Sequence, residues 1–328
     1  MPRSYELDVA DYGCEVERPR PIDAKVFPRF AGVRTFMRLP HARDLRGVDV
    51  AAIGIPFDTA TSFRAGSRFG PEAIRSASAL LRPFHPVFGI DLLEALAVVD
   101  YGDLPVSPGE TERTYAQVEE ALTPVVEAGV FPLVFGGDHS ITLAELRPLA
   151  QVHGPMALVQ FDSHTDTWDA YFGQRYFHGT TFKRAAEEGL IVPEASVQAG
   201  IRGSLYGAGD LDESRRLGFH IVASEELRAL SPERFAQLVS ERVGDRPVFL
   251  SFDIDFLDPA FAPGTGTPEV AGFSTADAVT YLRTLRGIRL AGCDVVELSP
   301  PYDAPGQPTA LAAANVLWEL LALRAAGA

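Results

Sequence analysis

Apolar runs of strand length alternate with amphipathic helical stretches along most of this 328-residue chain. The expected strands are Val48–Pro56, Leu96–Asp100, Phe131–Gly136, Met156–Asp162, Ala195–Ile201, Phe219–Val222, Pro247–Asp253 and Leu290–Glu297. Helical patterns lie near residues 71–82, 110–129, 140–152, 179–189, 208–217, 231–244, 274–287 and 309–325. Continuous apolar strands that alternate with helices are typical of a parallel sheet covered on both faces. The sequence therefore predicts an α/β fold around a mainly parallel sheet of about eight strands.

No linker, charge block or low-complexity stretch divides the chain, which indicates one large domain. Residues 1–45 are rich in proline and arginine and weakly periodic, so we expect an irregular N-terminal arm there. Residues 46–328 are then a single catalytic domain. Its size allows roughly 75% of the unfolded surface to be buried, which is enough to fold without disulfides.

The chain has 29 basic and 44 acidic residues and a formal net charge of -15. This charge disfavours nucleic acids and anionic membranes as partners and mildly favours a cationic substrate. Cys14 lies in a polar segment and Cys293 in an apolar strand, which indicates a reducing compartment rather than a disulfide framework. Residues 1–6 lack the apolar core of a signal peptide, and no apolar run approaches the ~20 residues of a membrane span. We therefore expect a cytoplasmic protein.

Three clusters of acidic and histidine residues each follow an apolar run, at the carboxyl edge where open α/β sheets bind ligands. With Asp138 assigned to a turn, they provide six candidate metal ligands: His139, Asp162, His164, Asp166, Asp253 and Asp255. Alternate residues of an extended segment point the same way, so the ligands within a cluster can converge. One ion rarely needs six protein ligands, whereas two ions that share bridging carboxylates would use them all. The clusters therefore predict a two-metal hydrolytic centre.

The ligand types favour Mn²⁺, with Ni²⁺, Co²⁺ or Zn²⁺ also compatible, because oxygen and imidazole donors occur without a thiolate. Each cluster also has a structural interpretation: His139 could belong to a helix-capping loop, and the other clusters could be polar loops. Buried carboxylates without a cation would, however, be costly to desolvate. Two further candidates lie at the same edge. His178 is suited to proton transfer or substrate binding, and Glu297 could bind a cationic group or be a surface carboxylate.

The chain resembles the ureohydrolases, the family of arginase and agmatinase, from about residue 30 onward. The resemblance rests on the three clusters and on segments 54–58 (Gly-Ile-Pro-Phe-Asp), 63–71 (Phe-Arg-Ala-Gly-Ser-Arg-Phe-Gly-Pro), 258–268 and 297–300 (Glu-Leu-Ser-Pro). It implies a three-layer α/β/α sandwich, two Mn²⁺ ions per subunit and a homotrimer or homohexamer. Ser163 stands where relatives commonly have alanine, and this change is not expected to disturb metal ligation.

The resemblance also implies a role for each candidate residue. It assigns His139 and Asp166 to one ion and His164 and Asp255 to the other. Asp162 and Asp253 would bridge both ions. Hydroxide would attack the guanidinium carbon, and Asp166 would pass a proton to the departing amine. Glu297 would hold the guanidinium, and His178 would shuttle protons or orient the substrate. The products would be urea and an amine.

The segment from Asp166 to Phe182 resembles bacterial agmatinases and lacks the polar loop with which arginases bind an α-amino-acid head group. It therefore favours agmatine, which would give putrescine for polyamine biosynthesis. The alternatives are 4-guanidinobutyrate, another guanidino acid, a proclavaminate precursor or guanidine. A guanidino acid would need a cation near the pocket mouth, and the candidates are Arg64, Arg175, Lys183, Arg184 and Arg202.

Two other functions fit the sequence less well. A two-metal phosphoesterase would need basic groups beside the metals, whereas Glu297 is acidic and the chain has no phosphate-binding Gly-rich Lys motif. An inactive regulatory or assembly protein would not be expected to contain all six ligands together with His178 and Glu297.

Overall fold

The computed structural model of the chain describes residues 20–21 and 23–327, and its centre is one eight-stranded parallel sheet. The strands are β1 (Val50–Ile55), β4 (Val98–Asp103), β5 (Phe131–Gly136), β6 (Ala157–Phe161), β7 (Val197–Ile201), β8 (His220–Ala223), β9 (Val248–Asp253) and β10 (Leu290–Val296). Across the sheet they lie in the order β4-β1-β5-β10-β9-β6-β7-β8. Every neighbouring pair is parallel. All eight predicted strands are therefore present.

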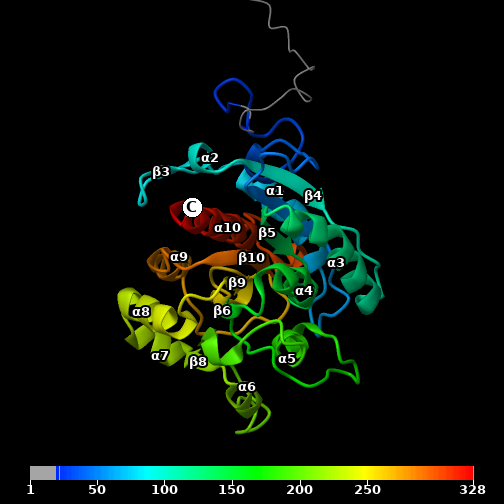
Figure 1. The fold of residues 1–328 in the computed structure, drawn as a ribbon, viewed down its shortest axis with the longest axis vertical. Coiled ribbons are helices and arrows are strands. Elements are labelled where there is room, and N and C mark those ends of the chain that lie inside the picture. Colours follow the sequence, from blue (N-terminus) through cyan, green and yellow to red (C-terminus); the bar gives the residue numbers. More distant parts are fainter. Residues whose placement is uncertain (1–19, 22, 328) are drawn as a thin grey trace, which may run out of the picture.

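Helices cover both faces of the sheet (Figure 1). One layer contains α1 (Gly70–Ser78), α7 (Ser224–Ala229), α8 (Pro232–Val243), α9 (Thr275–Thr284) and α10 (Pro308–Ala326). The other contains α3 (Thr111–Glu127), α4 (Ile141–His153), α5 (Thr181–Glu187) and α6 (Asp212–Leu217). Each layer packs on the sheet through its own apolar core. The structure confirms the predicted α/β fold and its three-layer α/β/α sandwich.

Local sequence signals explain several of these helix boundaries. The Ser274 hydroxyl accepts a hydrogen bond from the Asp277 amide (3.1 Å), and the Asp277 carboxylate accepts one from the Ser274 amide (3.0 Å). This reciprocal pair is a capping box, which satisfies two amides at the start of α9. Pro232 occupies the first turn of α8, where a missing amide proton costs nothing.

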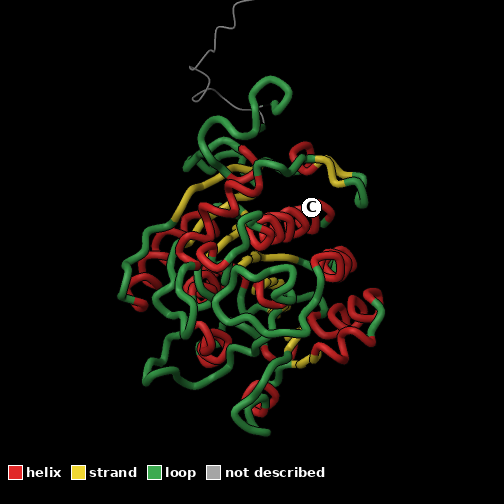
Figure 2. Tube along the Cα trace, turned by 180° about the vertical axis from the view of Figure 1, so that it is seen from behind, coloured by secondary structure: helices red, strands yellow, loops and turns green. Residues whose placement is uncertain are grey.

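The sequence did not predict the shortest elements. A small antiparallel hairpin, β2 (Phe84–His85) with β3 (Ile90–Asp91), leads into α2 (Leu92–Ala95), and α7 was also missed. The hairpin strands and α2 have only two to four residues, which is too few to show a hydrophobic period. The remaining turns are the 3-10 helices η2 (Phe36–Arg38), η3 (Ser67–Phe69), η4 (His178–Thr180), η5 (Pro193–Ala195), η6 (Ile254–Phe256) and η7 (Pro300–Tyr302). Long loops join the larger elements (Figure 2).

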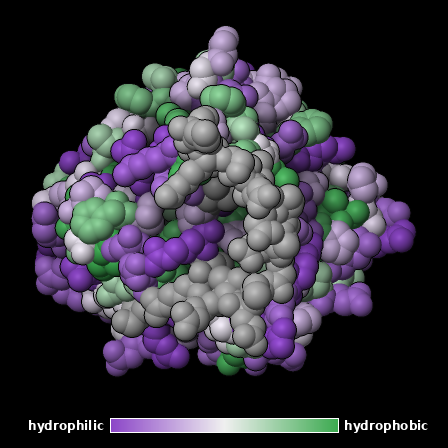
Figure 3. Space-filling model, turned by 90° about the horizontal axis from the view of Figure 1, so that it is seen from above, coloured by the Kyte–Doolittle hydropathy of each residue, from purple (hydrophilic) through white to green (hydrophobic). Residues whose placement is uncertain are grey.

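Part of the predicted N-terminal arm contacts the body of the protein. Within its described residues, Phe36 and Leu39 are buried in the core beneath α1 and α10. The Phe36 amide donates a hydrogen bond to the Asp100 carboxylate (2.7 Å). Cys14 lies outside the described residues, whereas Cys293 is a buried free thiol in β10. Outside the grey atoms, the face shown in Figure 3 is mainly hydrophilic, with separate apolar groups.

Helix α10 corrects one expectation from the sequence. By length and composition it could cross a membrane, although no apolar run was expected to approach that length. Within the described residues, 72% of its most apolar window is buried inside the protein. Residues such as Leu317 and Leu320 pack in the core between α1 and α9, so its apolar character is that of a core helix.

Candidate metal centre

The three predicted clusters and Glu297 meet at the carboxyl ends of four neighbouring strands. His139 follows β5, Asp162 follows β6, Asp253 ends β9 and Asp255 lies in η6. Glu297 follows β10, which lies between β5 and β9 in the sheet. Parallel strands bring their carboxyl ends to one edge, so residues more than 100 positions apart become neighbours. The structure thus brings all the predicted candidates to a single edge of the sheet.

His139, Asp162 and Asp166 form the first group of candidate ligands, whose atoms all lie within 4.8 Å of one another. His139 Nδ1 lies 3.2 Å from Asp162 Oδ2, 2.9 Å from Asp166 Oδ2 and 3.2 Å from Asp253 Oδ2. The other ring nitrogen, Nε2, is hydrogen-bonded to the Ser251 hydroxyl (2.8 Å). Nδ1 is buried without a hydrogen bond, so a donor atom and three carboxylates face the same space.

Asp162, His164 and Asp255 form the second group. His164 Nδ1 lies 3.1 Å from Asp255 Oδ2 and 3.6 Å from Asp162 Oδ1. Asp255 Oδ2 is buried without a hydrogen bond, whereas its Oδ1 accepts from the Ser163 amide (3.0 Å) and hydroxyl (2.7 Å). The free oxygen therefore faces His164. Asp162 belongs to both groups, as a bridging carboxylate would.

The carboxylates and histidines of the site shift one another's pKa values. Burial and the charges of Asp255 and Asp162 raise the pKa of Asp253 well above its usual value. Burial lowers the pKa of His139, but the surrounding carboxylates outweigh it and raise that pKa well above normal. Buried like charges are stable only when neutralised. Orphaned donor atoms, oxygen and imidazole ligands and excess negative charge together fit two hard divalent ions.

Two of the candidate residues have left-handed backbone conformations, with φ of 50° at Asp166 and 65° at Glu297. Residues other than glycine are strained in this region, and such strain is concentrated at functional sites. Asp138 occupies the turn that the sequence predicted. Its carboxylate accepts hydrogen bonds from the Ala60 amide (2.9 Å) and the Ser140 amide (3.0 Å), so it shapes the loop that presents His139.

Glu297 and His178 form a buried pair beside the first group. Glu297 Oε1 accepts from the His139 amide (2.8 Å) and lies 3.0 Å from His178 Nδ1. The Ser62 amide donates to His178 Nε2 (3.1 Å), so the proton of the neutral ring is on Nδ1 and points at Glu297. Glu297 Oε2 is buried without a hydrogen bond, and a Cβ at Gly266 would lie 3.1 Å from it. This carboxylate therefore has one oxygen available for a ligand.

Sequence reasoning missed several side chains that support the site. Ser251 is two residues before Asp253 in β9, so strand alternation could have placed it on the ligand face. Ser62 contacts His178 across 116 positions of sequence, and no local pattern predicts that contact. The Ser163 hydroxyl donates to the Asp255 carboxylate (2.7 Å).

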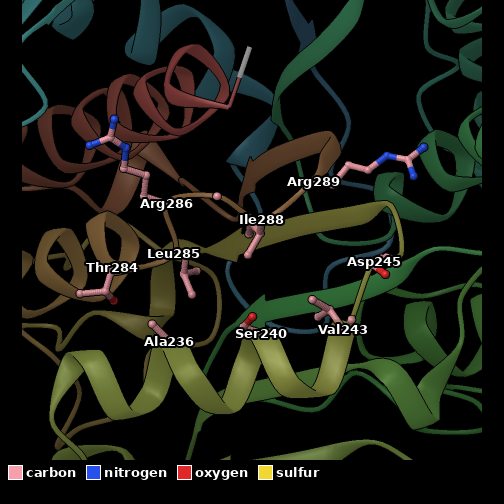
Figure 4. A pocket seen from close by; sticks show the side chains of 11 residues that line it. Ala236, Ser240, Val243, Asp245, Thr284, Leu285, Arg286, Ile288 and Arg289 are labelled. Carbon is pink, nitrogen blue, oxygen red and sulfur yellow. The ribbon is translucent and has the colours of Figure 1, made fainter.

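A separate pocket lies at the opposite edge of the sheet (Figure 4). Residues of α8 and of the turn from α9 to β10 line it, including Ser240, Asp245, Arg286 and Arg289. These segments precede β9 and β10, so the pocket is at the amino ends of the strands. It contains none of the predicted site residues.

Comparison with known proteins agrees with the site geometry. The sequence matches the arginase family over residues 48–323. It is 45% identical over 313 residues to the guanidinopropionase of Pseudomonas aeruginosa, covering 95% of this chain and 98% of that protein. It is 42% identical over 301 residues to the mitochondrial agmatinase of Gallus gallus, covering 92% of this chain and 88% of that protein.

The fold matches solved structures equally well. The proclavaminate amidino hydrolase of Streptomyces clavuligerus superposes with a TM-score of 0.87 at 42% identity, covering 92% of this chain and all of that one (100%). The relatives are named for different guanidino substrates at nearly the same identity, so similarity alone does not distinguish among them. The family match covers most of the chain and includes both His/Asp groups, and the chain is therefore a metal-dependent ureohydrolase of the arginase family.

Proposed function

We propose that this enzyme uses two Mn²⁺ ions to release urea from a linear guanidino compound. The main support is the convergence of two His/Asp groups that share Asp162. His139 and Asp166 would hold one ion, and His164 and Asp255 the other. Asp253, which faces His139 Nδ1 at 3.2 Å, would join Asp162 as the second bridging ligand. When bound, the ions would lower the pKa of a water and so supply hydroxide near neutral pH.

The residues around the ligands would bind the guanidinium and move protons. Glu297 Oε2 is the buried oxygen without a partner, so it would accept the guanidinium N–H groups. Burial and the charge of Asp162 raise the pKa of Asp166, which suits that carboxyl to carry a proton to the departing amine. His178, held between Glu297 and Ser62, would keep Glu297 oriented and exchange protons with it.

The charged side chains around the site indicate what the end of the substrate away from the guanidinium could be. Four of the five candidate cations already have partners: Arg175 with Glu187, Lys183 with Asp169 and Glu213, Arg184 with Asp169, and Arg202 with backbone carbonyls. Arg64 makes no ion pair or side-chain hydrogen bond within the described residues, and its guanidinium lies over Tyr302 and Phe63. Its carbonyl oxygen would be 3.5 Å from a Cβ at Gly266, beside Glu297. We therefore propose a guanidino acid substrate whose carboxylate pairs with Arg64.

Agmatine, which the sequence favoured, is the second candidate, and one observation supports it. Glu269 lies three residues beyond Gly266, and a Cβ at Gly203 would be 2.5 Å from its carboxyl group. Glu269 has no ion pair within the described residues, so it could bind the amine of agmatine. Arg64 and Glu269 thus offer opposite charges to the substrate tail.

Urea release would separate these substrates. Mn²⁺-loaded enzyme would be assayed on 3-guanidinopropionate, 4-guanidinobutyrate, agmatine, arginine and guanidine. We expect kcat/KM to be at least about tenfold higher for a guanidino acid, since a close charge pair between substrate and enzyme can contribute more than the ~1.4 kcal/mol that tenfold requires. Arg64→Gln should abolish that preference, and Glu269→Gln should not. A preference for agmatine that depends on Glu269 would show that the substrate is agmatine, while the proposed urea-releasing reaction would stand. If no compound released urea, the proposed function would be refuted.

The homotrimer or homohexamer implied by the family is also proposed here. Exposed apolar side chains, among them Phe30, Val33 and Val87, give the subunit surface that an interface could bury. Light scattering of the purified enzyme would measure the mass directly, and a monomer of 35.5 kDa would contradict this assembly.

A further inference from the structure

Arg202 follows β7 and donates only to backbone carbonyls. Its Nη2 donates to the carbonyls of Asp255 (2.6 Å) and Glu269 (2.9 Å), with Leu257 at 3.3 Å. Its Nε donates to Val270 (3.2 Å) and its Nη1 to Gly200 (3.3 Å). No carboxylate forms an ion pair with it within residues 20–21 and 23–327. A guanidinium with five carbonyl partners and no counter-ion is an unusual arrangement for a partly buried cation.

These partners belong to the second ligand group and to the loop beside Glu297. The backbone amide of Arg202 donates to the Ser163 carbonyl (3.0 Å), between Asp162 and His164. Arg202 therefore holds the segment of Asp162 and His164 through its backbone, and the segment of Asp255 through its side chain. Burial lowers the pKa of Arg202, while the charges of Asp255 and Asp162 oppose that effect.

The surrounding chain leaves room for this guanidinium. A Cβ at Gly272 would lie 2.5 Å from Arg202 Nη2, so only glycine allows the loop to approach so closely. The first ligand group has a different supporting contact, since His139 Nε2 is hydrogen-bonded to the Ser251 hydroxyl. None of the hydrogen bonds of Arg202 reaches His139 or Asp166.

We infer that Arg202 is a positioning residue that prearranges the site formed by His164 and Asp255, so that its loss weakens one of the two ions selectively. This inference rests on the proposed two-ion function. Residues that orient metal ligands typically contribute 10- to 100-fold to metal affinity. Lysine would retain the charge of Arg202 but not the planar fork that reaches several carbonyls at once.

The test is a Mn²⁺ titration of metal-free full-length protein, followed by equilibrium dialysis and by the electron paramagnetic resonance signal of spin-coupled ions. Arg228→Lys is the matched control, because Arg228 donates to the Ala271 and Gly272 carbonyls of the same loop and contacts neither ligand segment. Wild type and Arg228→Lys should bind two ions. Arg202→Lys should bind the first ion with unchanged Kd and the second about 10- to 100-fold more weakly. Its kcat should recover at high Mn²⁺, which a general folding defect would not allow.

Other results would overturn the inference. They are wild-type Kd values for both ions in Arg202→Lys, or an equal loss of both. Should Arg202→Lys not fold, hydrogen exchange of metal-free wild type provides the measurement: the amides of Ser163, Asp255 and Arg202 should already be protected, and rapid exchange would refute prearrangement. A wild-type protein that binds fewer than two ions would instead refute the proposed function.

Discussion

Replacement of Glu297 by glutamine isolates the charge that is expected to bind the guanidinium. The side chain is 1% exposed, and its Oε1 already accepts from the His139 amide. Glutamine keeps the shape and can keep that hydrogen bond through its carbonyl oxygen. It places an amide donor where the guanidinium needs an acceptor, at the position of the unpaired Oε2.

The size of the effect follows from burial. Removing one partner of a buried ion pair costs about 3–5 kcal/mol, because the other charge is left without compensation. At about 1.4 kcal/mol per factor of ten, kcat/KM should fall about 10²- to 10⁴-fold. The carbonyl oxygen of glutamine can still accept from the His139 amide and from His178 Nδ1, so the fold around the site should be kept.

The assay is urea release with metal content and Tm measured on the same samples. Glu145→Gln is the matched control, because burial raises the pKa of Glu145 well above its usual value and its oxygens have no hydrogen-bond partner. Glutamine keeps the shape of this buried side chain, and Glu145 is not a candidate ligand, so kcat/KM should change less than about threefold. If Glu297→Gln retains kcat/KM within tenfold while holding both ions, another group binds the guanidinium. Loss of metal would instead assign Glu297 to positioning His139.

Asp253→Ala or His164→Ala should remove metal and urea release together, and normal values of both in either variant would contradict the ligand assignment. Ser163→Ala removes one of the two donors to Asp255 Oδ1, the hydroxyl at 2.7 Å. A hydrogen bond to a charged acceptor is worth about 1.5 kcal/mol, so the ion at His164 and Asp255 should bind about tenfold more weakly. An unchanged Kd for that ion would show that the Ser163 amide alone is enough to hold Asp255. The pKa values of His139, His164 and His178 are raised in the folded protein. In metal-free protein these histidines therefore stabilise the fold fully below their unfolded pKa of about 6.5, and this contribution is lost as pH rises through the folded pKa. The Tm of metal-free protein should therefore fall above neutral pH while that of Mn²⁺-loaded protein does not, because metal replaces the protons; parallel curves would argue against metal at these histidines.

The sequence predicted the sheet because apolar runs of strand length alternate with amphipathic helical stretches. All residues of β1, β5, β9 and β10 are buried, which is why these strands appear as continuous apolar runs. The ligand clusters were predictable for the same reason, since charged residues at the end of a buried strand interrupt that pattern. They are conspicuous in a single sequence.

Contacts between distant segments could not be predicted in this way. Arg202 appeared to be one of five arginines and lysines that might hold a carboxylate, yet its side chain donates to the backbone carbonyls of Gly200 and of residues 255–270. Ser62 looked like an ordinary loop residue until the fold placed it against His178. A side chain's role in such contacts depends on which loops meet, and neither spacing nor composition determines that.

Because the site is assembled from central strands far apart in sequence, ions bound there would act as long-range cross-links within one chain. His164 and Asp255, which would hold one ion, are 91 residues apart, and His139 and Asp253 beside the other are 114 apart. A link that closes a loop of about 100 residues restricts the unfolded ensemble as strongly as a disulfide there, by about 4–5 kcal/mol in the chain-entropy account. During synthesis the nascent chain cannot complete either ion's ligand set, with its bridging carboxylates, before β9 has emerged and paired with β6. Retention of both ions would then report that the central sheet has reached its native strand order.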